Sequence, residues 1–135
     1  MITTFTSMKG GTGKTTITGL LANYCSRILN KRVIIIDIDP QGGSTTLFLG
    51  PEAREIIDGK SSPTIYTVLE AVRDNTNARG VVAKALIKSP INENVFILPA
   101  DYRVTSLMSM GETPDLLRYA LEDASFAPEI LVLID

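Results

Sequence analysis

The stretch KGGTGKTT, from Lys9 to Thr16, follows a short β-rich run, Ile2 to Thr6, and leads into residues whose apolar positions recur with helical spacing. A glycine-rich turn between a strand and a helix lets successive backbone N–H groups point at phosphate oxygens, and the helix N-terminus adds its positive dipole. This stretch therefore predicts a phosphate-binding loop.

Each polar residue of the loop has an expected partner in a bound nucleotide. Lys14 supplies a compact charge to the β and γ phosphates, the Thr15 hydroxyl can bind Mg²⁺, and Thr16 can reach a more proximal phosphate. The general pattern G-x-x-x-x-G-K-[ST] asks for glycine at position 8, where this chain has Met8, but three other glycines keep the loop flexible. The residues expected to contact the nucleotide are Lys9, Gly10, Gly11, Thr12, Gly13, Lys14, Thr15 and Thr16.

Lys9 is a second cation at the start of the loop, five residues before Lys14. Because Lys14 suffices for the bound phosphates, Lys9 is free for a separate task. We expect it to reach across an interface to the phosphates held by another subunit.

Three apolar runs without polar alternation, Val33–Ile36, Val95–Leu98 and Ile130–Ile134, are typical of strands buried on both faces. Helical segments separate them. The pattern predicts an α/β fold with a mainly parallel sheet flanked by helices on both faces, and the phosphate loop after the first strand makes the expected fold that of a P-loop NTPase.

Carboxylates follow two of these runs. Asp37 and Asp39 come after Val33–Ile36, and Asp135 ends the last run. The carboxyl edge of a parallel sheet is where ligands of doubly wound folds bind, so these groups are candidates for the Mg²⁺ shell or for positioning water. On an extended strand Asp37 and Asp39 would share a face, although the strand end and Pro40 leave that geometry open.

The first helix is expected to begin at Lys14 and to end near Asn30. Its large apolar residues follow the i, i+3, i+4, i+7 spacing, which predicts that they form the buried face. These residues are Ile17, Leu20, Leu21, Tyr24 and Ile28. A further helix is expected from Thr113, with Pro114 at its first position.

Composition excludes several classes of protein. The 135 residues carry a net charge of −2, contain no histidine and have one cysteine, Cys25. A histidine-dependent reaction, an internal disulfide and a zinc cluster are therefore excluded for this chain, and no broad basic footprint for nucleic acid is present. No signal peptide or membrane-length apolar run is seen. We expect a cytoplasmic protein that does not use a membrane.

KGGTGKTT together with DIDPQGGST at residues 37–45 resembles the deviant Walker A ATPases of the ParA/Soj partition type, relatives of MinD. The resemblance runs through nearly all of the chain. It implies that 1–135 is the N-terminal portion of one such domain, cut after the Walker B strand. It also implies catalytic roles for Lys9, Lys14 and Asp39, with Asp39 orienting the attacking water.

The resemblance also implies ATP and Mg²⁺ as cofactors, with Thr15, Asp37 and Asp135 around the metal. It implies an ATP-dependent homodimer, a ParB-like centromere-binding partner, and nonspecific DNA binding through a C-terminal half that is absent here. The expected function is an ATPase in plasmid or chromosome segregation, with weak or no activity in the fragment alone. The alternatives are a ParA-like ATPase that positions another cargo and a biosynthetic ligase of the dethiobiotin-synthetase type.

Overall fold

The computed structural model describes residues 1–5, 11, 13–61, 63–111 and 113–135. These residues contain a five-stranded sheet in the order β1-β5-β2-β4-β3, in which β1, β5, β2 and β4 are parallel and β3 is antiparallel to β4. The strands are β1 (Ile2–Thr4), β2 (Val33–Ile36), β3 (Ile87–Lys88), β4 (Val95–Leu98) and β5 (Leu131–Ile134). The predicted mainly parallel sheet is confirmed.

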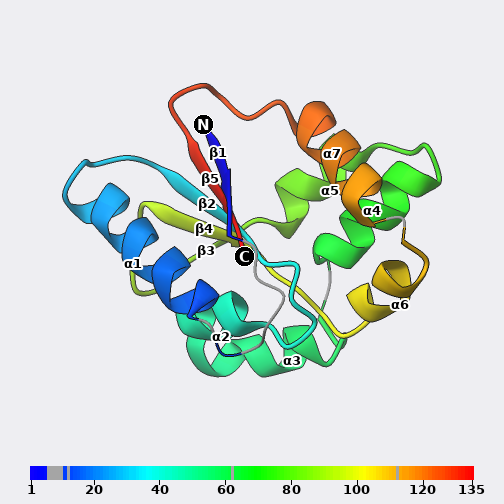
Figure 1. The fold of residues 1–135 in the computed structure, drawn as a ribbon, viewed down its shortest axis with the longest axis horizontal. Coiled ribbons are helices and arrows are strands. Elements are labelled where there is room, and N and C mark those ends of the chain that lie inside the picture. Colours follow the sequence, from blue (N-terminus) through cyan, green and yellow to red (C-terminus); the bar gives the residue numbers. More distant parts are fainter. Residues whose placement is uncertain (6–10, 12, 62, 112) are drawn as a thin grey trace.

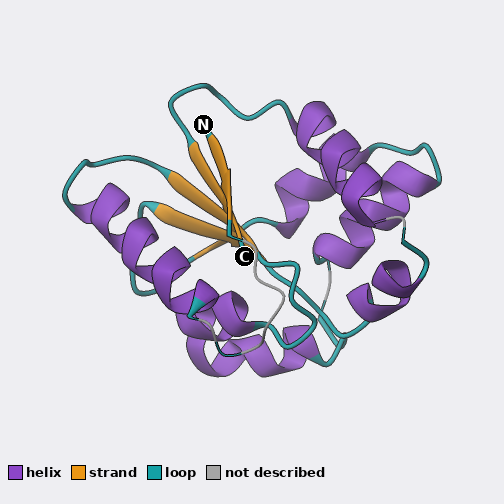
Figure 2. Cartoon of the chain, in the orientation of Figure 1, coloured by secondary structure: helices purple, strands orange, loops and turns teal. Residues whose placement is uncertain are grey.

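Helices cover both faces of this sheet (Figure 1). They are α1 (Lys14–Arg27), α2 (Gly43–Leu49), α3 (Ala53–Ile57), α4 (Ile65–Arg73), α5 (Ala78–Ala85), α6 (Val104–Ser109) and α7 (Thr113–Ala124), with a 3-10 turn at Gly50–Glu52. Helices α1, α2 and α3 lie on one side of the sheet, and α4 to α7 lie on the other (Figure 2).

Strand β2 shows why helices must pack on both faces of the sheet. Val33 and Ile35 pack into the core under α1, α2 and α3, whereas Ile34 and Ile36 pack into the core under α4 to α7. Alternate residues of a strand point to opposite faces, so an uninterrupted apolar run has to be buried twice. The three-layer arrangement brings the carboxyl ends of β2 and β5 side by side, since these two strands pair directly.

The predicted buried face of α1 is wrong. Ile17, Leu20, Tyr24 and Ile28 are exposed, and Leu21 is only partly buried. The helix instead turns its smaller residues to the protein interior, and these are Thr18, Gly19, Ala22, Cys25 and Ser26. Small side chains allow α1 to approach the sheet closely, and both buried hydroxyls have partners: Ser26 Oγ donates to the Ala22 carbonyl at 2.6 Å, and Thr18 Oγ1 donates to Asp135 at 3.3 Å. Here close packing and hydrogen bonding outweigh the hydrophobic periodicity.

The bounds of α1 agree with the prediction better than its buried face does. The helix begins at Lys14, and Asn30 beyond its end has a φ of +50°. Asparagine tolerates this left-handed conformation better than most residues, which suits it to follow a helix. The helix from Thr113 is also confirmed as α7.

Candidate nucleotide-binding site

The N-terminus of α1 forms the described part of the predicted phosphate loop. Gly13 caps the helix with a φ of +83°, a conformation that favours glycine, and its carbonyl accepts the Ile17 amide at 2.9 Å. Lys14 and Thr15 begin the helix and are partly buried, while Thr16 is exposed. The first amides of a helix have no partner within it, so they are available to an anion.

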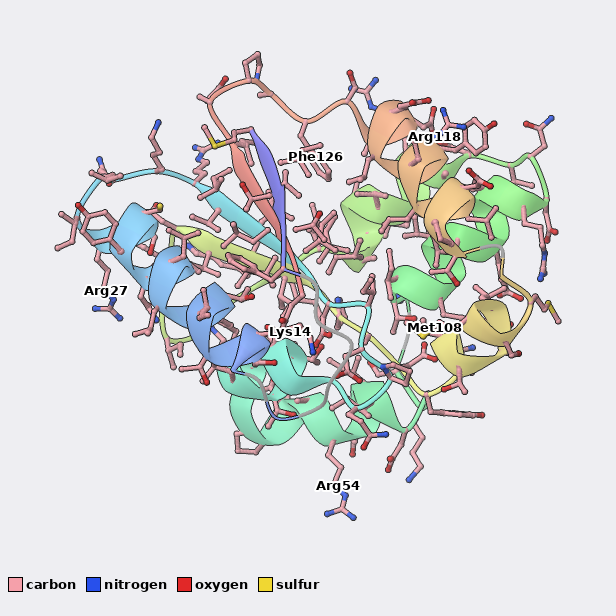
Figure 3. All side chains as sticks on the ribbon, viewed as in Figure 1. Lys14, Arg27, Arg54, Met108, Arg118 and Phe126 are labelled. Atoms are coloured by element: carbon pink, nitrogen blue, oxygen red, sulfur yellow. The ribbon has the colours of Figure 1, made fainter. Side chains whose placement is uncertain are left out.

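Lys14 lies close to the carboxyl ends of the strands (Figure 3), whereas Arg27, in the last turn of the same helix, lies at the outside of the molecule. Gly11 is exposed and has a φ of +72°. The other predicted loop residues, Lys9, Gly10 and Thr12, lie outside the described residues. Their expected contacts remain predictions.

Asp37 directly follows β2 and is fully buried. Its amide donates to the Leu98 carbonyl at 3.0 Å. Its Oδ2 accepts both the amide and the hydroxyl of Thr45, each at 2.7 Å, and its Oδ1 accepts the Asp39 amide at 3.1 Å. Burial raises the pKa of Asp37 to about 6, although the hydrogen bonds from Thr45 oppose that shift.

Asp135 occupies the equivalent place after β5 and is also buried. Its Oδ2 accepts the Ser44 hydroxyl at 2.5 Å, and its Oδ1 accepts the Thr18 hydroxyl at 3.3 Å. The negative charge of Asp135 contributes to the raised pKa of Asp37, because the two carboxylates are close enough to repel each other. The structure therefore brings together the ends of two strands that are almost a hundred residues apart in sequence.

Asp39 lies beyond the end of β2 and is partly exposed. Its Oδ1 accepts the Gln41 amide at 2.9 Å, and its carbonyl accepts the Gly42 amide at 2.8 Å. The chain therefore turns here instead of continuing as a strand, and Asp37 and Asp39 do not form a common strand face. Asp39 keeps one carboxylate oxygen outside this turn.

The first turn of α2 adds three residues that end the stretch DIDPQGGST but for which the sequence predicted no role. Gly43 lies against the phosphate loop, because a Cβ at this position would come within 2.9 Å of Thr15 Oγ1. Ser44 and Thr45 follow and are fully buried. The sequence places these residues in a polar turn after Asp39, and only their contacts with Asp37 and Asp135 mark them as part of the site.

A magnesium ion with its nucleotide fits this donor set. Among the described residues, no group of three or more acidic or cysteine side chains is close enough to enclose a metal ion. Mg²⁺ does not require such a cage, because it keeps several waters and binds through one or two carboxylates plus substrate phosphates. Thr15 beside α2, with Asp37 and Asp135 at adjacent strand ends, provides that smaller set.

The raised pKa of Asp37 predicts how stability depends on pH in EDTA. The folded chain binds the proton of the Asp37 carboxyl more tightly than the unfolded chain does, because the pKa is about 6 in the folded chain and 3.8 in the unfolded chain. The stabilisation that this proton provides is therefore lost as the pH rises from about 4 to about 6. As the pH falls from about 7 to about 4.5, the free energy of unfolding of the wild type should rise by about 2 kcal/mol relative to that of Asp37→Asn. Urea unfolding of both proteins measures this difference. A difference that is the same at the two pH values would contradict the raised pKa.

Comparison with known proteins assigns the fold to a family. Residues 1–124 match the family described as AAA domain. The chain belongs to this family, as a P-loop ATPase of the ParA/MinD type. It is 52% identical over 130 residues to the chromosome-partitioning ATPase Soj of Thermus thermophilus, an alignment that covers 96% of this chain and 43% of Soj.

Solved structures agree with this family. An ATP complex of McdA from Cyanothece is similar with a TM-score of 0.69 and 28% identity, over 99% of this chain and 46% of McdA. Cobyrinic acid a,c-diamide synthase from Mycobacterium smegmatis, with bound ADP and magnesium, has a TM-score of 0.69 at 20% identity, over 98% of this chain and 49% of the synthase. The second likeness shows the fold alone. This chain spans less than half the length of each of the three relatives.

Proposed function

We propose that the chain binds Mg-ATP and is the nucleotide-binding part of a partition ATPase that acts as an ATP-switched dimer in plasmid or chromosome segregation. One observation carries the proposal. Helix α1, which begins with Lys14 and Thr15, lies against the buried carboxylates at the ends of the adjacent strands β2 and β5: its Thr18 hydroxyl donates to Asp135 Oδ1 at 3.3 Å, and Thr15 lies against Gly43 of α2, the helix whose next two residues bind both carboxylates. The 52% identity to Soj supports the assignment to partition rather than to another reaction.

Each residue of the site has a separate role in this proposal. The α1 amides and Lys14 bind and orient the phosphates, while Thr15, Asp37 and Asp135 hold Mg²⁺ directly or through water. When bound, the metal neutralises charge on the phosphate oxygens. Asp39, with one carboxylate oxygen outside its turn, orients the attacking water. Loss of the γ-phosphate then releases the dimer contact made by Lys9.

The partners follow from the same proposal. We expect a ParB-like centromere-binding protein to stimulate hydrolysis, and the dimer to bind DNA without sequence preference. In the described part of the chain, no helix has the length and apolar character needed to cross a bilayer.

Biosynthetic ligase chemistry remains the contrasting class. The likeness to the diamide synthase extends to the fold only, so it does not favour this reaction. A turnover assay separates the two classes: centromere partner and DNA should stimulate ATP hydrolysis, and small carboxylic acids should not. Stimulation by a small acid alone would overturn the partition assignment.

Replacing Lys9 by alanine tests the dimer switch. A charge-assisted hydrogen bond to phosphate across the interface is lost, so ATP-dependent dimerisation of the full-length protein should weaken by roughly tenfold or more. ATP binding to the monomer should change by less than about threefold, because Lys14 makes the contact within the subunit. Sedimentation with ATP and with ADP measures the first quantity, and nucleotide titration of dilute protein measures the second. Normal dimerisation of Lys9→Ala with ATP would remove the role across the interface.

A further inference from the structure

Two consecutive hydroxyls at the start of α2 hold the two buried carboxylates of the site. Ser44 Oγ donates to Asp135 Oδ2 at 2.5 Å, and Thr45 Oγ1 donates to Asp37 Oδ2 at 2.7 Å. All four side chains are buried. Neighbouring residues of one short helix therefore reach the ends of two different strands.

Thr45 is held in place from a third direction. Its hydroxyl also accepts the Ala100 amide at 3.1 Å, and its own amide donates to Asp37 Oδ2 at 2.7 Å. The hydroxyl is thus a donor to Asp37 and an acceptor from the turn after β4. A group bound on both sides has little freedom to rotate, so it orients the carboxylate of Asp37.

The same helix start touches the third residue proposed to hold the metal. The close approach of Gly43 to Thr15 Oγ1 leaves little room for a larger side chain between α1 and α2. The first turn of α2 is therefore in contact with Thr15, Asp37 and Asp135 at once.

We propose that Ser44 and Thr45 are positioning residues for magnesium. Their hydroxyls fix the orientation of Asp135 and Asp37, so the affinity of the site for Mg²⁺ in the presence of nucleotide depends on them. Loss of an outer-shell hydrogen bond to a metal-binding carboxylate typically lowers metal affinity by about one to two orders of magnitude. The inference rests on the proposed function, because it concerns the same magnesium and nucleotide.

The test uses variants that differ by one hydroxyl. Thr45→Val keeps the branched shape and removes the hydroxyl, Thr45→Ser keeps the hydroxyl, and Ser44→Ala removes the contact with Asp135. Ser89→Ala is the matched control, because Ser89 is a buried serine whose hydroxyl donates to the Phe48 carbonyl of α2 at 2.8 Å, away from the carboxylates. A fluorescent ADP derivative is titrated in EDTA, and Mg²⁺ is then titrated into the complex.

For Thr45→Val and Ser44→Ala, the Mg²⁺ concentration at half-effect should rise by about tenfold or more, while nucleotide affinity in EDTA stays within about threefold of wild type. Thr45→Ser and Ser89→Ala should match the wild type in both measurements. Rescue by Thr45→Ser distinguishes positioning from a general loss of packing. If Thr45→Val does not fold, Ser44→Ala decides the outcome.

Two results would overturn the inference. One is a wild-type Mg²⁺ response in a folded Ser44→Ala or Thr45→Val protein, and the other is an equal loss of nucleotide affinity with and without Mg²⁺. In either case the wild type still binds Mg²⁺ with nucleotide, and the proposed function stands. A wild type that binds no nucleotide would overturn the proposed function and this inference together.

Discussion

Lys14→Ala is expected to weaken ATP binding by about two orders of magnitude, through loss of one charge-assisted contact with the β and γ phosphates. Lys14 begins α1, where the helix amides and the positive end of the helix dipole already favour an anion. The amides remain in the variant, so residual binding is expected instead of none. Isothermal titration with ATP and Mg²⁺ measures the change in affinity.

The control for Lys14→Ala is Lys31→Ala. Lys31 is exposed beyond the other end of α1, so this variant removes the same charge far from the loop. Its ATP affinity should remain within about twofold of the wild type, because an exposed charge at that distance is screened by salt. Equal affinities of Lys14→Ala and wild type would remove Lys14 from the proposed phosphate site.

In the full-length protein, Asp39→Ala and Asp39→Asn should both slow ATP hydrolysis by about a hundredfold or more and accumulate an ATP-bound dimer. The two variants separate catalysis from folding. Asparagine retains an oxygen that can accept the Gln41 amide, as Asp39 Oδ1 does at 2.9 Å, whereas alanine loses this hydrogen bond. Only the carboxylate, however, can orient the attacking water as an anion.

Single-turnover phosphate release and sedimentation of the same samples measure the effect of the Asp39 variants. Loss of the turn hydrogen bond should reduce the stability of Asp39→Ala by about 1 kcal/mol relative to Asp39→Asn. Rapid phosphate release by Asp39→Asn, with slow release by Asp39→Ala, would assign Asp39 to the turn alone. Rapid release by both would remove it from the reaction.

The sequence was sufficient for the elements that depend on local patterns. The runs Val33–Ile36 and Val95–Leu98 were predicted with the bounds that the structure shows, because a strand buried on both faces is apolar at every position. The first residue of α1 was also predictable, since a glycine loop must end before a helix can begin. The short helices α2, α3, α5 and α6 were not predicted. Each has eight or fewer residues, too few for a clear helical period.

The buried side of α1 shows a different kind of failure. Periodicity identified an apolar stripe, but it could not show which side faces the sheet. Ala22 is fully buried whereas Leu20 is 67% exposed, and the buried residues of α1 are all small. The distance between a helix and a sheet depends on how their side chains pack together, so it cannot be predicted from the sequence of either segment alone.

The sequence alone determined the chemistry available to this protein: a glycine loop with two lysines, and carboxylates after two buried strands. Tertiary structure decided how these groups meet. Ser44 and Asp135 are 91 residues apart, yet they form a hydrogen bond because β2 and β5 pair directly and α2 follows β2 closely. The physical reason is that local patterns report the conformation of a segment, whereas the strand order sets which distant side chains share the edge of the sheet.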